Sequence, residues 1–133
     1  MDNRKELAEW RFEKAEQCLK TAKISIETGD YAGAANRSYY CVFHCIRSVF
    51  ALHGVDFKKH AAVIAYFREK YIKTGIFEKR LSDIIGKLFI LRNESDYDDF
   101  FIINKSSIVE QVENAEYFME QIKNYLDNYK LKD

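Results

Sequence analysis

Apolar side chains recur every three or four residues along most of the chain, which is the spacing of one face of a helix. Between residues 3 and 28 the stripe consists of Ala8, Phe12, Ala15, Leu19, Ala22 and Ile26. Between residues 105 and 129 it consists of Ile108, Val112, Ala115, Met119, Ile122, Leu126 and Tyr129. The pattern predicts a long amphipathic helix near each end of the chain, and the second stripe has the spacing of a bundle seam.

Three further helices are predicted between these two. Residues 31–53 are apolar on nearly all sides, which is typical of a central helix that contacts several neighbours. A shorter helix is expected over residues 59–72, closed at Gly75, and another over residues 78–96. The buried face of this last helix consists of Leu81, Ile84, Ile85, Leu88 and Leu91.

The expected helix ends coincide with residues that favour such positions. Gly29 can adopt the left-handed conformation that ends a helix, and Asp30 can cap the helix that follows. The central helix is expected to break at Gly54, and Ser107 with Glu110 is a candidate capping box for the last helix.

Few segments alternate with period two, and the 133 residues include no proline, which favours long uninterrupted helices. The chain is therefore predicted to be all-α, an up-and-down helical bundle of about five helices in a single domain over residues 1–133. Its apolar runs are too short for a membrane span of about 18 residues, and its charged N-terminus does not resemble a signal peptide. Three cysteines, an odd number, add the expectation of a reducing, cytoplasmic setting with no membrane association.

Charge is distributed unevenly although the formal net charge is zero. Residues 31–92 have a net charge of +7, whereas residues 93–133 have a net charge of −6. A basic middle segment can attract phosphate while the acidic end repels it. The alternative is that the two segments neutralise each other within or between subunits.

The stretch LRNESDYDD, residues 91–99, places polar side chains where the helical stripe of residues 78–96 should stay apolar. Helical spacing puts Arg92, Asp96 and Asp99 along one side, with Ser95 beside them. In a structural interpretation, the Arg92 guanidinium forms an ion pair with Asp96 and closes the end of the bundle. In a functional interpretation, the end of the bundle opens into a cleft where Arg92 meets an anionic ligand.

Two stretches resemble the HEPN domain family. They are AANRSYYCVFHCIRSVFALHGVDFKKHAAVIAYF, residues 34–67, and LFILRNESDYDDF, residues 88–100. The first is similar to the family's segment of Tyr-Tyr, then Phe-His, then a later histidine, and the second to its arginine motif with a following Asp-Tyr. The resemblance covers roughly residues 5–127 and agrees with the five-helix layout.

The resemblance implies a homodimer that needs no cofactor or metal. Many HEPN domains are metal-independent ribonucleases whose motif arginine is followed a few residues later by a histidine, with both subunits contributing to one cleft. Small stand-alone members are often encoded beside a minimal nucleotidyltransferase as a toxin–antitoxin pair. In some pairs that partner modifies a tyrosine near the motif.

Arg92 matches the family's arginine, but the expected histidine position holds Tyr97. Because histidine has a pKa near 6.5 and tyrosine one near 10, a tyrosine is a poor replacement for histidine in the usual acid–base chemistry. His44 or His60 could replace the missing group if folding brings either one near Arg92. The alternative is that each is a core histidine, bonded to a tyrosine or a backbone carbonyl.

Site residues are assigned as follows. Arg92 is expected to bind phosphate, Asp96 to orient Arg92, and Tyr97 to donate a hydrogen bond or to be the modified group. His44 and His60 are secondary candidates for catalysis. RNA or a nucleotide is expected to contact Arg92, Arg37 and Tyr40.

Other signatures are weak or missing. Cys41, His44 and Cys45 lie at helical spacing and could bind zinc with His60, but buried cysteines of a central helix fit the pattern better. The chain has no GxGxxG, P-loop or GxSxG motif.

The sequence thus predicts an RNA- or nucleotide-directed protein, partner of a minimal nucleotidyltransferase in a toxin–antitoxin or defence pair. One alternative is a non-catalytic dimeric binding module that holds the nucleotidyltransferase. Another is a plain structural dimer in which the polar group is an ion-pair lock.

Overall fold

The computed structural model describes residues 3–98 and 101–129, and within them it contains helices and no strand. The α-helices are α1 (Arg4–Glu27), α2 (Tyr31–His53), α3 (His60–Phe67), α4 (Lys79–Tyr97) and α5 (Lys105–Asn128). The all-α prediction is confirmed, and apart from α3 each helix begins and ends within one residue of its expected bounds. No helix in the described part of the chain is both long enough and apolar enough to cross a bilayer.

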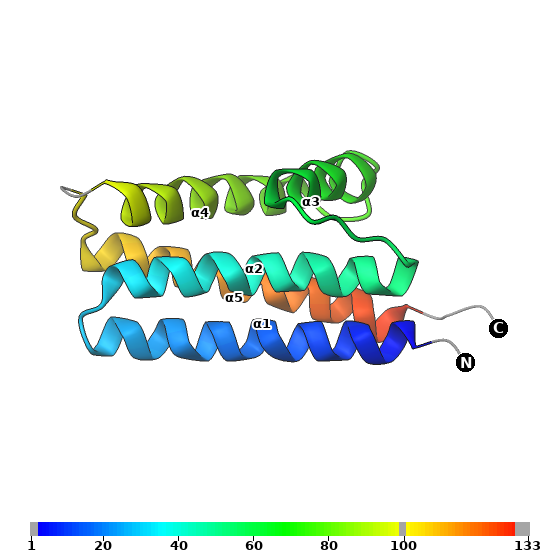
Figure 1. The fold of residues 1–133 in the computed structure, drawn as a ribbon, viewed down its shortest axis with the longest axis horizontal. Coiled ribbons are helices and arrows are strands. Elements are labelled where there is room, and N and C mark those ends of the chain that lie inside the picture. The colour runs from blue at the N-terminus through cyan, green and yellow to red at the C-terminus, as the bar shows by residue number, and fades with distance from the viewer. Residues whose placement is uncertain (1–2, 99–100, 130–133) are drawn as a thin grey trace.

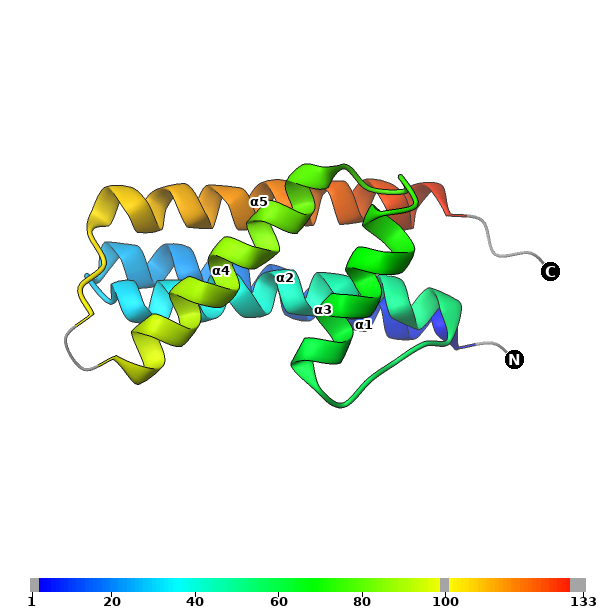
Figure 2. The ribbon, with the colours of Figure 1, turned by 90° about the horizontal axis from the view of Figure 1, so that it is seen from above.

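Three long helices lie side by side, and the other two cross them (Figures 1 and 2). α2 and α5 run in the same direction and α1 runs against them, while α3 and α4 lie on the side of α2 and α5 that faces away from α1. α2 occupies the centre and contacts α1, α3, α4 and α5. This position explains why its sequence is apolar on nearly all sides.

The centre of the core is a cluster of aromatic and aliphatic side chains from all five helices. Phe50 of α2, Phe67 of α3 and Phe118 of α5 are fully buried and pack together, with ring centroids 6.5 Å apart for the first pair and 5.9 Å for the second. Burial of each such ring contributes about 1.5–3 kcal/mol relative to exposure, and truncating one to alanine costs about 3–5 kcal/mol.

The predicted stripes of α1 and α5 form the core with small changes. Ala8 to Ala22 of the α1 stripe are buried and are joined by Cys18. In α5, Phe118 is buried, whereas its neighbour Met119, which the regular seam predicted, is only half-buried. The buried face of α5 shifts toward Phe118 because α5 packs against α1, α2 and α4 rather than along one partner.

Most helix ends agree with the sequence. Gly29 and Gly54 have φ angles of 80° and 66°, and an Asp30 carboxylate oxygen accepts a 2.8 Å hydrogen bond from the Gly33 amide. The prediction of a Ser107–Glu110 capping box is wrong. The cap is Asn104, whose side chain accepts from the Ser107 amide at 2.8 Å, so Ser107 already lies inside the first turn.

The predicted third helix changes its winding part of the way along. After α3, residues Arg68–Ile72 form a π-helical turn, and the Lys73 amide bonds to the Arg68 carbonyl at 2.8 Å. The wider turn keeps Tyr71 buried, with its ring stacked on Phe67 at a centroid distance of 5.5 Å.

Candidate functional site

Arg92 extends from α4 onto two consecutive tyrosines of α2. Its guanidinium carbon lies 5.2 Å from the centre of the Tyr39 ring and 5.4 Å from that of Tyr40. A guanidinium nitrogen also donates to the Tyr40 hydroxyl at 3.4 Å. Both ring distances are within the range of cation–π attraction, so the tyrosines hold the arginine head at the surface of α2.

Asp96 lies on the same side of α4 as Arg92. Because four residues advance a helix by about 40° beyond one full turn, the two side chains meet, and Arg92 Nε is 3.1 Å from Asp96 Oδ2. The N–H is not aligned for a hydrogen bond, so the contact is an ion pair. The side chains are 18% and 30% exposed, which places the pair at the edge of the core rather than inside it.

His60, the first residue of α3, belongs to the same cluster. Its Nδ1 is 3.0 Å from the Tyr39 hydroxyl, and its ring stacks on Phe43 with a centroid distance of 4.1 Å. Burial lowers the pKa of His60, and the charges of Arg92 and Arg47 lower it further. Burial raises the pKa of Tyr39 to about 12, so at neutral pH the hydroxyl is protonated and the imidazole is neutral.

Arg37, one turn before Tyr40 on α2, also contacts the Tyr40 ring. Its guanidinium carbon lies 5.2 Å from the centre of the Tyr40 ring. Two of its nitrogens donate to the Asn36 side-chain oxygen at 3.0 and 2.6 Å, and the third contacts Cys18 Sγ at 3.9 Å. Three predicted residues, Arg37, Tyr40 and Arg92, are therefore brought together.

His44 is one turn further along α2 and contacts the cluster through Tyr40 and Phe43, at ring distances of 6.1 and 6.2 Å. It lines a separate pocket of about 530 Å³ together with Trp10, Lys14 and Cys18. Burial lowers the pKa of His44 to about 4, and Lys14, Arg47, Arg37 and Arg11 add to the effect. Its Nδ1 is buried without a hydrogen-bond partner in the described structure.

Tyr97 lies apart from Arg92. Five residues advance the helix by about 140° beyond a full turn, so the tyrosine projects from another side of α4. It is 77% exposed and makes no hydrogen bond or ring contact with any residue that the structure describes. Asp99, expected in the same polar group, lies outside the described residues, and the Ser95 hydroxyl bonds to the Leu91 carbonyl at 2.7 Å.

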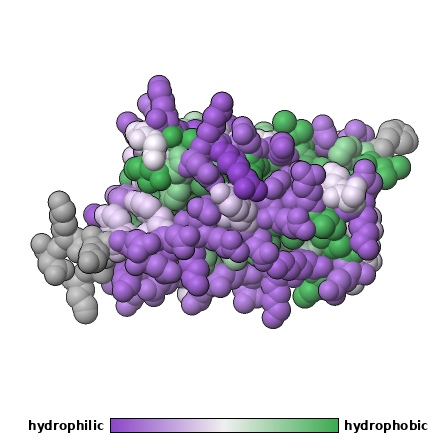
Figure 3. All heavy atoms as spheres, turned by 180° about the vertical axis from the view of Figure 1, so that it is seen from behind, coloured by the Kyte–Doolittle hydropathy of each residue, from purple (hydrophilic) through white to green (hydrophobic). Residues whose placement is uncertain are grey.

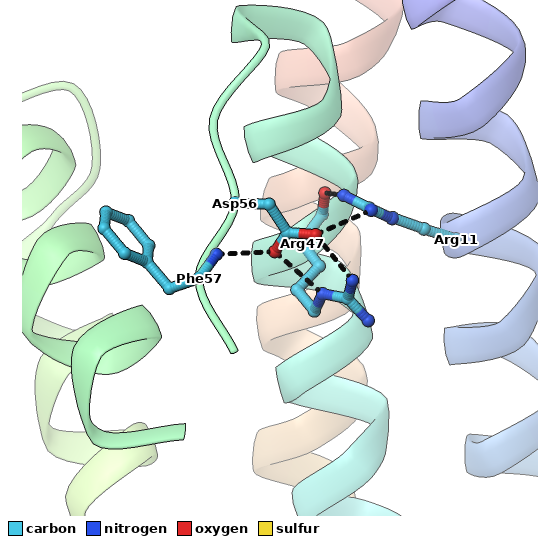
Figure 4. Close-up of polar contacts among 4 residues, drawn as sticks. All are labelled: Arg11, Arg47, Asp56 and Phe57. Carbon is cyan, nitrogen blue, oxygen red and sulfur yellow. Dashed lines mark hydrogen bonds and ion pairs between the residues drawn. The ribbon is translucent and has the colours of Figure 1, made fainter. Parts of the chain in front are cut away.

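A second charged cluster, absent from the sequence-based predictions, lies beside the first. Asp56, in the loop between α2 and α3, pairs with Arg47 of α2 at 2.7 Å and with Arg11 of α1 at 3.0 Å (Figure 4). Arg11 also donates to the Arg47 carbonyl at 3.0 Å, and the Phe57 amide donates to Asp56 at 2.8 Å. The hydrogen bond from Arg47 is the largest cause of a lowered pKa for Asp56, so this carboxylate is charged at neutral pH.

Sequence reasoning offered a tyrosine as a partner of His60 but did not identify it as Tyr39, whose hydroxyl is 3.0 Å from His60 Nδ1. The available signal was that a buried tyrosine hydroxyl needs a polar partner. The expectation for the cysteines is confirmed, because Cys41 and Cys45 are fully buried in α2.

Comparison with known proteins finds one matching family model and several similar proteins. The model of the HEPN domain matches residues 8–126. A UPF0332 protein of Thermotoga maritima is 26% identical over 98% of both chains. A UPF0332 protein of Archaeoglobus fulgidus is 30% identical over 87% of this chain and 92% of its own, and a Methanocaldococcus jannaschii protein named "Putative toxin MJ0605" is 34% identical over 86% and 85%.

Proposed function

Because the chain belongs to the HEPN domain family, we propose that it is a toxin-like protein that binds RNA and cleaves it slowly without a metal ion. The toxin-like role is supported by the name of the Methanocaldococcus jannaschii relative. Three buried free cysteines fit a reducing cytoplasm, where we place the protein. The match over residues 8–126 supports a single HEPN domain.

The observation that carries the proposal is the presence of a cation and a neutral imidazole on the same pair of tyrosines. Arg92 lies over Tyr39 and Tyr40, and His60 bonds to the Tyr39 hydroxyl. RNA cleavage needs a base for the 2′-hydroxyl proton and a positive charge for the phosphate. His60 and Arg92 supply both, although they come from different helices.

The reaction can be written with these groups. His60 takes the 2′-hydroxyl proton at Nε2 while Nδ1–H donates to Tyr39, which requires that tautomer. The 2′-oxygen attacks the phosphorus, a 2′,3′-cyclic phosphate forms, and the bond to the 5′-oxygen breaks. That oxygen takes a proton from water, because the Tyr39 side chain is 2% exposed and does not reach it, and His60 later releases its own proton to solvent. Lack of a positioned acid costs about 10²–10⁴ in rate, so cleavage is slow.

Three predicted residues support Arg92 in this scheme. Asp96 orients the guanidinium through the 3.1 Å ion pair. The Tyr40 ring is close to both guanidinium carbons, 5.4 Å from that of Arg92 and 5.2 Å from that of Arg37. RNA phosphates bound here meet two cations at one aromatic platform.

The partner is a minimal nucleotidyltransferase that modifies Tyr97. The 77% exposure of Tyr97 supports this role, since a transferring enzyme must reach the phenol oxygen. That oxygen would attack the α-phosphate of a nucleoside triphosphate and release pyrophosphate. The added phosphodiester places a negative charge at the end of α4 and competes with RNA for the cations nearby.

We also propose a homodimer. The apolar side chain of Ile90 on α4 is 57% exposed. By contrast, the face seen from behind in Figure 3 is mostly hydrophilic. The seam of α5 is covered within the subunit, so the exposed apolar side of α4 is the better candidate for self-association.

A non-catalytic binding module is the second candidate function. The position of Tyr97 favours it, because the residue in the motif histidine's place lies away from Arg92. In this alternative the helical bundle holds the nucleotidyltransferase and leaves RNA intact.

One experiment separates the two functions. A fluorescent single-stranded RNA is titrated with the wild type and with the Arg92→Gln, His60→Gln and Arg80→Gln variants, and cleavage is followed on gels with EDTA present. We expect RNA binding in the wild type, loss in Arg92→Gln, and loss of cleavage alone in His60→Gln. Arg80, whose guanidinium lies over Tyr117, is the matched control. Absence of RNA binding in the wild type would leave the binding module as the function.

A further inference from the structure

The pocket between α2 and the loop that precedes α3 adjoins the Arg92 cluster. It has a volume of about 500 Å³ and is lined by Phe43, Arg47, Asp56, Phe57, Lys58 and His60. His60 belongs to both places, because it lines this pocket and also bonds to Tyr39 beneath Arg92. A ligand that contacts His60 can therefore extend toward Arg92 in one direction and into the pocket in the other.

The pocket retains positive charge after its own ion pairs are counted. The single carboxylate of Asp56 faces two guanidiniums, those of Arg47 and Arg11 (Figure 4). Lys58 adds a further cation, which forms no ion pair with any described residue. The net charge favours an anion.

Unused hydrogen-bond donors are available in the same pocket. Arg47 donates to Asp56 through Nε and Nη2, at 3.3 and 2.7 Å, so Nη1 has no partner within the described chain. The Lys58 ammonium is also without one. Guanidinium and ammonium donors together suit phosphate, and the half-buried aromatic ring of Phe57 suits a flat base.

We propose that this pocket is a second phosphate subsite, and that the unit recognised is a ribonucleoside with phosphates on both its 3′ and 5′ oxygens. The proposal rests on the proposed function. There, Arg92 holds the phosphate that is cleaved and His60 faces the 2′-hydroxyl. That hydroxyl belongs to the nucleotide on the 5′ side of the cleaved phosphate. The next phosphate beyond it is therefore the 5′-phosphate of the same nucleotide, and it reaches Arg47 and Lys58.

This arrangement gives His60 a position between two phosphate anchors. With only Arg92, a bound phosphate could rotate and carry the ribose away from the imidazole. With a second anchor, the ribose is fixed at both ends and its 2′-hydroxyl stays against His60. Fixing the reacting group in this way favours attack on the phosphorus.

The test uses ribonucleoside 3′,5′-bisphosphates of all four bases, together with the matching 3′-monophosphates, measured by calorimetry. These compounds lack the leaving nucleotide and are not cleaved. We expect the wild type to bind at least one bisphosphate about tenfold more tightly than its 3′-monophosphate, as a charge-assisted contact predicts. Lys58→Gln should bring this ratio close to one and leave the 3′-monophosphate affinity unchanged, whereas Arg80→Gln should leave both unchanged.

Arg47→Gln should have the same effect as Lys58→Gln, but it also loosens the Asp56 cluster, so Lys58→Gln is the cleaner variant. Equal affinities for the two ligands in the wild type would overturn the second subsite while the Arg92 site stands. A ratio that survives in both variants would do the same. If instead the 3′-monophosphate does not bind, or Arg92→Gln does not weaken it, the proposed function fails and the subsite with it.

Discussion

Replacing Arg92 by alanine should harm RNA binding much more than it harms the fold. The contacts of Arg92 set the size of the stability loss. The partly exposed ion pair with Asp96 is worth about 0.5–1 kcal/mol. Each cation–π contact is worth about 0.5 kcal/mol, because the ring distances of 5.2 and 5.4 Å approach the limit of about 6 Å. The 3.4 Å hydrogen bond to Tyr40 is long and adds little.

The sum is about 1.5–2 kcal/mol, below the roughly 3–5 kcal/mol lost when one partner of a fully buried ion pair is removed. Urea denaturation at pH 7 measures the loss, and titration with single-stranded RNA at two salt concentrations measures binding. We expect RNA affinity to fall by about tenfold or more, with a smaller dependence on salt. Arg80→Ala, on the same helix, should leave RNA affinity unchanged.

A double-mutant cycle with Asp96→Ala sharpens the result. The coupling between Arg92 and Asp96 should be about 0.5–1 kcal/mol. A stability loss above about 3 kcal/mol with unchanged RNA affinity would mean that the pair is an ion-pair lock, and the functional interpretation would be refuted.

Three further predictions concern pH, assembly and chemistry. Because the pKa of His44 is lowered from 6.5 to about 4, its contribution to stability is full above pH 6.5 and is lost as pH falls toward 4. His44 is partly exposed, so urea denaturation should show a loss of only about 1–2 kcal/mol in the free energy of unfolding over this pH range. The His44→Gln variant should lack this loss, and a variant with the same pH profile as the wild type would contradict the prediction. Light scattering at micromolar concentration should give twice the 15.7 kDa chain mass, and a monomer at all concentrations would exclude the dimer. RNA cleavage should survive EDTA and should not rise in Tyr97→His, because position 97 lies away from Arg92; a gain in that variant would show that a partner subunit brings it to the cleft.

The helices could be predicted because their signal is local. An apolar stripe and its capping glycines are determined within each segment, and the pair Arg92–Asp96 follows from a spacing of four residues. The Ser107 cap failed because Asn104, three residues earlier, is the stronger competitor for the same role.

The roles of the two histidines could not be separated by the same reasoning. His44 and His60 were equal candidates, since the sequence does not show which of them folding brings near Arg92. The fold-back of α3 over α2 brings His60 to Tyr39, whereas the packing of α1 on α2 places His44 against α1. The Arg11–Arg47–Asp56 cluster was missed for a related reason, because its members come from two helices and a loop. Asp56 is 45 residues from Arg11 and 9 residues from Arg47 in the sequence.

The π-helical turn at Arg68–Ile72 restricts how the length of this chain can change during evolution. Deleting one residue there would restore α-helical winding and rotate the following segment by about 100° relative to Phe67. Tyr71, now stacked on Phe67 at 5.5 Å, would leave the core, and α4 with Arg92 would enter the bundle from a different direction. A relative with one residue fewer in this segment should therefore carry compensating changes at the start of α4, whereas length changes in an exposed loop should need none.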